Sequence, residues 1–109
     1  MKGLVFNNNI LAGYLQRDSF GAYTFEYHPV YFADKSKQAI SLTLPKSERI
    51  HYSSELFSFF FGLLSEGINK DIQCRALRID ENDYFRRLLL TAGNDTIGAI
   101  TIKPEGDGL

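Results

Sequence analysis

The segment Tyr23-Thr24-Phe25-Glu26-Tyr27-His28-Pro29 decides the character of the first half of the chain. Aromatic residues alternate with polar ones along it. Because successive side chains of a strand point to opposite faces, this alternation predicts a strand with one buried face. Pro29 ends the predicted strand, since proline has no backbone N–H to donate to a neighbouring strand.

Further strands are predicted on both sides of this segment. A short strand around Val5 and Phe6 leads into the turn Asn7–Asn9, because asparagine tolerates positive φ. Residues 10–16 form the next strand, and residues 17–21 form a turn. Residues 30–38 are predicted to be irregular or a helical turn. Alternation then returns in Ala39–Leu44, which predicts a strand with Ile40, Leu42 and Leu44 on one face.

From Ser53 onward the apolar period changes to about 3.6 residues, which predicts helices. Ser53 or Ser54 is the expected N-cap of a first helix that Gly67 ends, and a second helix is expected over Ile68–Ile79. The third is expected to begin after Asp80 as N-cap, with Asp83 in capping-box position, and to end at Gly93. The residues expected to face inward are Phe57, Phe60, Phe61 and Leu64, then Ile68, Ile72, Ala76 and Ile79, then Tyr84, Phe85, Leu88 and Leu89.

The order of these elements predicts the fold class. Strands come first, helices follow, and a last strand over Ile97–Lys103 returns to the sheet. This order is typical of an α+β domain. We expect an antiparallel sheet of about five strands with three helices packed at one face or end. Residues 1–105 are expected to form one domain and residues 106–109 a disordered tail.

Composition excludes several classes of protein. The chain has 109 residues and a formal net charge of -1, which argues against a general nucleic-acid-binding or anionic-membrane surface. Its one cysteine, Cys74, excludes an internal disulfide and fits a reducing compartment. No apolar run approaches the ~20 residues of a membrane helix, and the N-terminus does not resemble a signal peptide. The expected location is the cytoplasm.

The residues needed for catalysis are missing from the sequence. A phosphate-binding enzyme needs closely spaced glycines before a helix, followed by lysine or metal ligands, and no such motif occurs. His28 and His51 have no Cys, Asp or Glu neighbours at metal-ligand spacing. Ala99–Lys103 has the form of a kinase lysine strand, but its partner motifs are absent. We therefore expect no enzyme activity, no cofactor and no metal.

An unusually apolar stretch, Leu56–Leu64, carries apolar residues at seven of its nine positions. A surface helix needs one apolar stripe of roughly 100°, so this stretch has more apolar residues than one stripe holds. The residues alone leave two interpretations open. All seven side chains are buried in the core, or some of them form an exposed patch for a partner.

Four segments in register carry a family resemblance. They are Ala22–Pro29, Ala39–Pro45, Phe59–Gly67 and Gly93–Ala99. In this order and spacing they resemble the N-terminal subdomain of the HipA family of serine/threonine kinase toxins. Gly62 and Ser65 stand where that family usually has asparagine and proline. The chain stops where such a kinase would only be starting.

The resemblance implies a protein-binding role. In the family this subdomain packs on the kinase N-lobe and carries no catalytic residue. Some operons encode it as a separate small antitoxin, often called HipS, beside a shortened kinase toxin and a HipB-like protein that binds DNA. The resemblance therefore implies a non-catalytic antitoxin that binds and inhibits a HipT/HipA-like kinase. The alternative is a trans-acting subunit or detached fragment that completes an active kinase.

The expected partner-binding surface lies in the apolar stretch and its flanks. The contact residues that we expect are Tyr52, Leu56, Phe57, Phe59, Phe60, Leu63, Ser65 and Glu66. A small nucleic-acid-binding β domain is a different class. Tyr14, Tyr23 and Tyr27 could stack on bases, but the net charge opposes that function.

Overall fold

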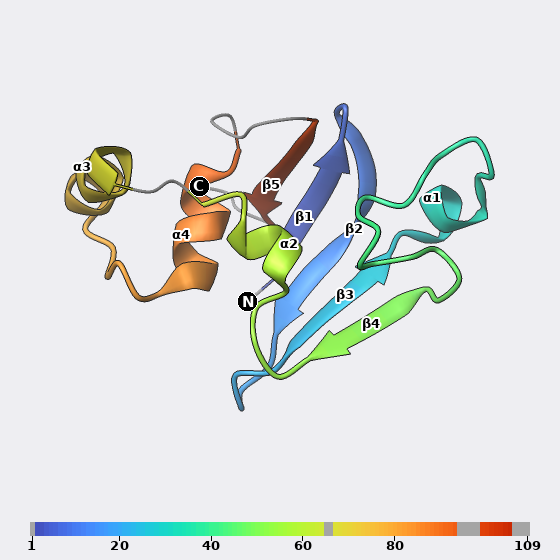
Figure 1. The fold of residues 1–109 in the computed structure, drawn as a ribbon, viewed down its shortest axis with the longest axis horizontal. Helices are drawn as coiled ribbons and strands as arrows, with labels where there is room; N and C mark the ends of the chain where they lie inside the picture. Colours follow the sequence, from blue (N-terminus) through green and yellow to red (C-terminus); the bar gives the residue numbers. More distant parts are fainter. Residues whose placement is uncertain (1, 65–66, 94–98, 106–109) are drawn as a thin grey trace.

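A five-stranded antiparallel sheet with strand order β4-β3-β2-β1-β5 carries the fold (Figure 1). The structure is a computed structural model, and it describes residues 2–64, 67–93 and 99–105. The elements are β1 (Lys2–Asn7), β2 (Ile10–Arg17), β3 (Tyr23–Tyr27), α1 (Pro29–Ala33), β4 (Ile50–Ser53), α2 (Ser58–Phe61), α3 (Gly67–Leu77), α4 (Tyr84–Thr91) and β5 (Ile100–Pro104). The α+β class and the antiparallel sheet are confirmed.

Tight turns connect the first three strands. Asn8 and Asn9 have φ angles of 51° and 66°, so the predicted asparagine turn joins β1 to β2. In the turn before β3, the Asp18 carboxylate accepts hydrogen bonds from the backbone N–H groups of Phe20 (2.8 Å) and Ala22 (3.0 Å). β5 then returns from the far end of the chain to pair antiparallel with β1.

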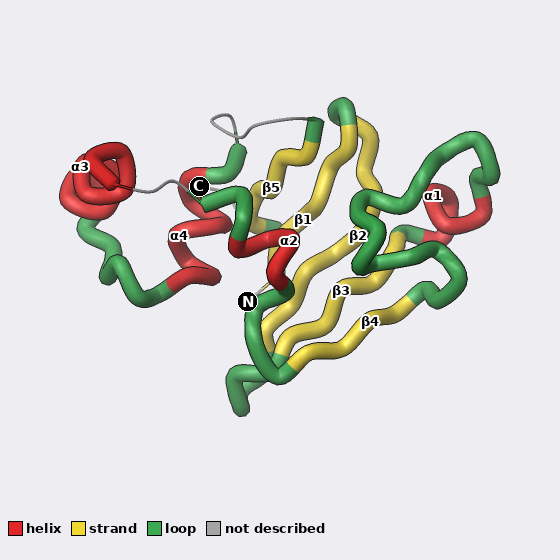
Figure 2. Tube along the Cα trace, in the orientation of Figure 1, coloured by secondary structure: helices red, strands yellow, loops and turns green. Residues whose placement is uncertain are grey.

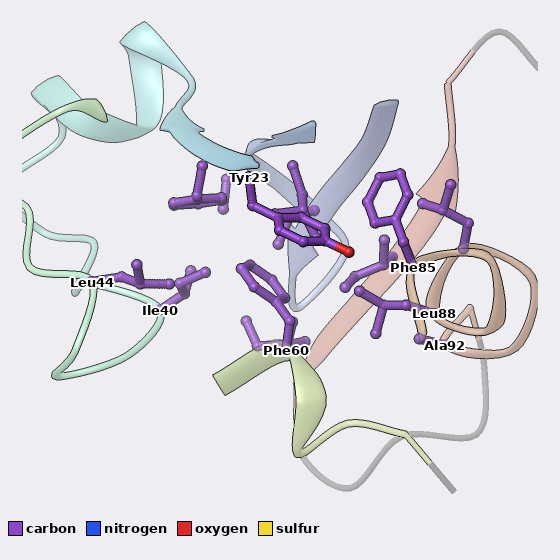
Figure 3. Close-up of a cluster of buried hydrophobic side chains, with 14 of the residues drawn as sticks. Tyr23, Ile40, Leu44, Phe60, Phe85, Leu88 and Ala92 are labelled. Atoms are coloured by element: carbon purple, nitrogen blue, oxygen red, sulfur yellow. The ribbon is translucent and has the colours of Figure 1, made fainter. Parts of the chain in front are cut away.

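The core lies between one face of the sheet and helices α2 and α4 (Figure 3). The alternation in β3 is confirmed, because Tyr23, Phe25 and Tyr27 are buried on this face. Phe60 from α2 packs on Phe25, with ring centroids 5.6 Å apart. Helix α4 contributes Phe85, among others, so its predicted inward face is confirmed except at the half-exposed Tyr84.

The predicted strand over Ala39–Leu44 is wrong. This segment belongs to the long loop between α1 and β4 (Figure 2), and Leu42 is 99% exposed while Ile40 and Leu44 are buried. The reason is a non-local contact. The Tyr27 hydroxyl donates a hydrogen bond to the Leu44 carbonyl and accepts one from the Ile40 N–H (3.1 Å). A side chain from β3 thus takes the place of a partner strand.

The first predicted helix is much shorter than expected. Helix α2 covers only Ser58–Phe61, and Ser53 ends strand β4 instead of capping a helix. The extended backbone that β4 needs to pair with β3 continues through Ser53, so a helix cannot begin there. The Ser53 hydroxyl accepts a hydrogen bond from the Glu55 N–H (3.2 Å) within a turn.

Helix α3 does not bury the predicted face. It covers Gly67–Leu77 and ends before Arg78, whose φ of 53° is left-handed. Ile72 and Ala76 are exposed, and Ile79, which follows the helix, is buried. The helix ends at Leu77 and Arg78 is left-handed, so Ile79 is separated from the stripe that contains Ile72 and Ala76. The side chain of Ile68 lies outside the described part.

The N-cap of α4 is Asp83, whose carboxylate accepts a hydrogen bond from the Arg86 N–H (3.2 Å). The predicted cap Asp80 instead accepts from the Asn82 N–H (2.9 Å) in the preceding turn. The last strand begins at Ile100, and the predicted start at Ile97 lies outside the described residues, as does the predicted tail over 106–109.

Candidate partner-binding surface

Two adjoining hollows lie beside β4 and α2. The first has a volume of about 540 Å³. It is lined by Thr43, Leu44, Glu48, Ile50, His51, Tyr52, Ser53, Glu55, Leu56, Phe57 and Ser58. The second has a volume of about 380 Å³ and is lined by Tyr23, Glu55, Leu56, Phe61 and Tyr84. Because Glu55 and Leu56 line both, the hollows form one continuous surface.

Large apolar side chains run along this surface. We call Leu56, Phe57, Phe61 and Tyr84 the aromatic band, and Tyr52 of β4 also lines the first hollow. Tyr52 is 76% exposed, Phe61 is 41% exposed and Tyr84 is 38% exposed. The rings of Phe61 and Tyr84 meet edge to face, with centroids 5.0 Å apart and planes at 74°. This pair joins α2 to the start of α4, so the band extends from α2 to α4.

Backbone geometry positions the band. Tyr52 lies opposite Thr24 of β3, so its side chain points to the sheet face away from the core, whereas the band lies on the side of α2 and α4. Phe57 precedes α2 in an extended conformation, with φ -55° and ψ 137°. Leu56 and Phe57 are half-buried and pack against the edge of the core. The apolar excess seen in the sequence is therefore divided between the core and the surface.

The structure brings some of the predicted contact residues together and separates others. Tyr52, Leu56 and Phe57 line the first hollow. Phe60 is fully buried against Phe25, which corrects its assignment to the contact surface, because a partner cannot reach its ring. Phe59 and Leu63 are half-buried and pack against the core. The predicted contacts Ser65 and Glu66 lie outside the described residues.

Two members of the band, Phe61 and Tyr84, were not expected at the surface. Both were assigned to inward helical stripes. Helix α2 is only four residues long. The 3.6-residue period of a helix therefore does not predict which side chains face inward outside these four residues. Tyr84 is the first residue of α4 and stands at the rim of the core. The spacing of the aromatic residues indicates more apolar side chains than one buried stripe holds. It does not indicate which of these side chains face solvent.

The charges along the first hollow are negative. Glu48 and Glu55 line it, and no lysine or arginine does. Neither carboxylate forms an ion pair with any residue that the structure describes. The nearby Arg49 is paired with Glu26 and does not line the hollow. The surface is thus apolar in its aromatic groups and acidic along the β4 edge.

The two histidines have structural partners. His28 caps α1 by accepting a hydrogen bond from the Val30 N–H (3.2 Å), and His51 Nε2 lies 2.9 Å from the Pro45 carbonyl oxygen. Within the described ranges, no three His, Cys, Asp or Glu side chains are grouped to hold a metal ion. Over the same ranges, no helix has the length and apolar content needed to cross a bilayer.

Comparison with known proteins identifies the family of the chain. The model of the HipA N-terminal domain family matches residues 4–103. An uncharacterized protein of Haemophilus influenzae is 35% identical over 103 residues, covering 94% of this chain and 92% of that protein. A Sinorhizobium fredii protein named "Putative kinase Y4mE" is 30% identical over 95 residues, which are 87% of this chain but only 22% of that protein.

A solved structure shares the fold. The structure described as the N-terminal domain of HipA toxin superposes with a TM-score of 0.68 and 33% identity. The match covers 95% of this chain and 93% of the solved one. On its sequence and its fold together, the chain belongs to the HipA N-terminal domain family.

Proposed function

We propose that this chain is a non-catalytic antitoxin that binds and inhibits a HipT/HipA-like serine/threonine kinase. The observation that carries the proposal is the aromatic band, because large aromatic side chains stay exposed beside two hollows although the core is complete without them. Exposed aromatic side chains next to pockets are typical of binding hot spots. Covering one such side chain stabilises a complex by about 1.5–3 kcal/mol before the costs of association.

Family membership supports the kind of partner. The domain corresponds to 22% of a longer protein that is named a kinase, so a domain of this type occurs next to other sequence in that protein. A kinase chain that lacks the domain would keep a complementary surface to which this chain binds. Inhibition follows when the bound domain holds the nucleotide loop or the substrate groove in an unproductive arrangement.

The proposal includes the setting of the complex. A HipB-like DNA-binding protein is its third member, and the binding surface of this chain is directed at the kinase. The complex forms in the cytoplasm, where a free thiol such as that of Cys74 remains reduced.

A second function uses the same surface. The Sinorhizobium match favours it, because there the corresponding domain is part of a single longer chain. In this alternative the protein supplies a missing subdomain and completes an active kinase. The two functions differ in the sign of their effect on phosphorylation.

Co-expression with a HipA-like kinase from the same genome tests both functions. Growth rescue together with a complex that co-purifies is the result expected for an antitoxin, and addition of this chain should then lower kinase autophosphorylation. A complex that raises phosphorylation would instead support the completing subunit. Failure to form any complex would contradict both.

A pair of variants tests the surface itself. Phe61→Ser should weaken kinase binding roughly tenfold or more, because it removes an aromatic side chain from the centre of the band. Val30→Ser is the matched control, since Val30 is also apolar and exposed but lies in α1, away from both hollows. Equal binding by the two variants in titration calorimetry would refute the assignment of the band.

A further inference from the structure

One edge of the sheet is covered. The Glu105 N–H donates a hydrogen bond to the Lys2 carbonyl (3.0 Å), so these two residues form a hydrogen-bonded pair between β5 and β1. Because bonded and non-bonded pairs alternate along an antiparallel pair of strands, Ile102 and Pro104 turn their backbone groups away from β1. The Ile102 N–H donates to the Ala92 carbonyl (2.9 Å) at the end of α4, and Pro104 has no N–H. The β5 edge therefore presents few groups to another strand.

The opposite edge, at β4, is open. The hydrogen bond from the Tyr27 N–H to the Arg49 carbonyl (2.8 Å) sets the phase of the β3–β4 ladder. Because bonding alternates along an antiparallel pair, His51 and Ser53 bond to β3, while Ile50 and Tyr52 direct their N–H and C=O groups outward. No hydrogen bond joins these outward groups to any other residue of the described chain.

The second strand pairing supports this phase. The His28 N–H donates to the Ala12 carbonyl (2.8 Å), so the alternate residues Thr24 and Glu26 of β3 bond to β2. Tyr23, Phe25 and Tyr27 are then free to bond to β4, as the first ladder requires. The outward direction of Ile50 and Tyr52 therefore follows from two independent hydrogen bonds.

The only protection that the open edge has against pairing is the shortness of β4, which has four residues. Natural edge strands carry lysine, proline or a bulge that discourages another strand, and Ile50–Ser53 contains none of these. The first hollow runs along this edge and is lined by both outward residues. Glu48 and Glu55 flank β4 on its two sides in the sequence and line the same hollow. The edge is thus shaped and charged for an extended, basic segment.

We infer that the β4 edge receives an extended segment of the kinase as a sixth strand of the sheet. This inference rests on the proposed function, which supplies the kinase as partner. Backbone groups of Ile50 and Tyr52 supply the strand's hydrogen bonds, and lysine or arginine side chains of the added segment lie against Glu48 and Glu55. Tyr52 lines the same hollow as Leu56 and Phe57, so the added strand adjoins the aromatic band.

Residue-resolved amide hydrogen exchange tests the inference. In the isolated chain, the Ile50 and Tyr52 amides should exchange rapidly, whereas those of His51 and Ser53 should be protected by β3. Kinase binding should slow exchange at Ile50 and Tyr52 roughly tenfold or more, and the probe is the purified kinase itself.

Each other outcome has a distinct meaning. A stable complex without new protection at these two amides would overturn strand addition and leave the proposed function intact. Absence of a complex would overturn the proposed function and this inference with it. Protection that grows with the concentration of the isolated chain, together with a dimer in gel filtration, would show a second copy at the edge and would also overturn the inference.

Variants of the edge give a second test. Ile50→Pro removes one outward N–H without removing a bond to β3, and Ile50→Val keeps that N–H. The proline variant should bind the kinase roughly tenfold more weakly than the valine variant. Equal affinities would overturn the inference. If the proline variant fails to fold in circular dichroism, the exchange measurement on the unaltered chain decides.

The charges are tested separately. Glu48→Gln combined with Glu55→Gln should weaken kinase binding severalfold at low salt, with a smaller effect at high salt. Asp71→Lys is the control for a changed net charge, because Asp71 is exposed on α3 and lines neither hollow of the surface. Equal losses in the two proteins would overturn the basic character assigned to the added segment.

Discussion

The two edge strands of the sheet, β4 and β5, differ in how they are covered, although both are short. β5 lies beside α4, whose buried residues fix the helix against the core and whose C-cap residue, Ala92, supplies its carbonyl to the edge. β4 is followed by the one-turn α2, which turns Phe60 inward and leaves the edge uncovered (Figure 1). Closure of an edge is therefore a by-product of core packing, and an edge remains open where the following helix is too short to cover it.

The largest effect is expected where α4 closes the β5 side. Leu88 is 0% exposed in the core, and Leu88→Ala should lower the free energy of unfolding by about 2–5 kcal/mol through lost burial and a cavity. Leu90 lies in the same helix but is 40% exposed, so Leu90→Ala should cost less than about 1 kcal/mol. Urea denaturation measures both. Equal losses would show that α4 does not anchor the closed side.

The next effect is expected at Tyr27, on the open side. Tyr27→Phe leaves the Ile40 N–H and the Leu44 carbonyl without their buried partner, which should cost about 1–3 kcal/mol. Tyr52→Phe removes an exposed hydroxyl and should cost nothing measurable in the same thermal or urea denaturation. A neutral Tyr27→Phe would mean that the loop does not depend on this hydroxyl.

Tyr27 also makes stability depend on pH. Burial raises its pKa from the ordinary 10.0 to about 12, so the folded state holds the phenol proton more tightly than the unfolded state does. Its contribution is complete below about pH 10 and is lost as the pH rises through 12. Denaturation between these pH values should show a smaller decline for Tyr27→Phe than for the unaltered chain. An unchanged decline would assign the alkaline loss to other groups.

A smaller effect is expected at the start of α4. Asp83→Ala removes the N-cap and should cost about 0.5–2 kcal/mol, and Asp83→Asn should recover most of it because asparagine also caps helices. Comparison of these two variants separates capping from the ion pair with Arg17 (3.6 Å). Asp80→Ala is the control, since Asp80 accepts only within the preceding turn. A larger loss at Asp80 in urea denaturation would restore it as the cap.

The smallest effect is expected at the open edge itself. Tyr52→Thr keeps a residue that favours strands and should change the free energy of unfolding by no more than about 0.5 kcal/mol. The matched comparison is Tyr23→Thr on the neighbouring β3, where the side chain is buried and packs on Phe85. Similar losses at both positions would mean that β4 is part of the stabilising structure and is not a surface reserved for a partner.

Local patterns in the sequence predicted the fold class and strand β3, because the alternation in Tyr23–Tyr27 matches the burial of the strand. These local patterns failed where contacts between residues far apart in the sequence determine the structure. Ile40, Leu42 and Leu44 alternate as in a strand, but the Tyr27 hydroxyl from β3 binds the backbone groups that strand pairing would need. Strand β4 has only four residues and was missed for lack of a long enough pattern.

The candidate surface was predictable in part. The excess of apolar residues in Leu56–Leu64 indicated a patch, and Tyr52, Leu56 and Phe57 do line one hollow. Phe61 meets the ring of Tyr84, which comes from another helix, so no local spacing could reveal this surface pair. Phe60 lies one position earlier and turns to the opposite side, into the core.

The pairing of β1 with β5 has a consequence for synthesis on the ribosome. A tight turn pairs β1 with β2. On the other side of β1, Leu4 pairs with Lys103, which lies near the opposite end of the described chain. Contacts of such long sequence separation form late in folding. Until β5 has emerged from the exit tunnel, β1 is paired only with β2 and forms an open edge of the nascent sheet, and a chaperone that shields such edges would act during that interval.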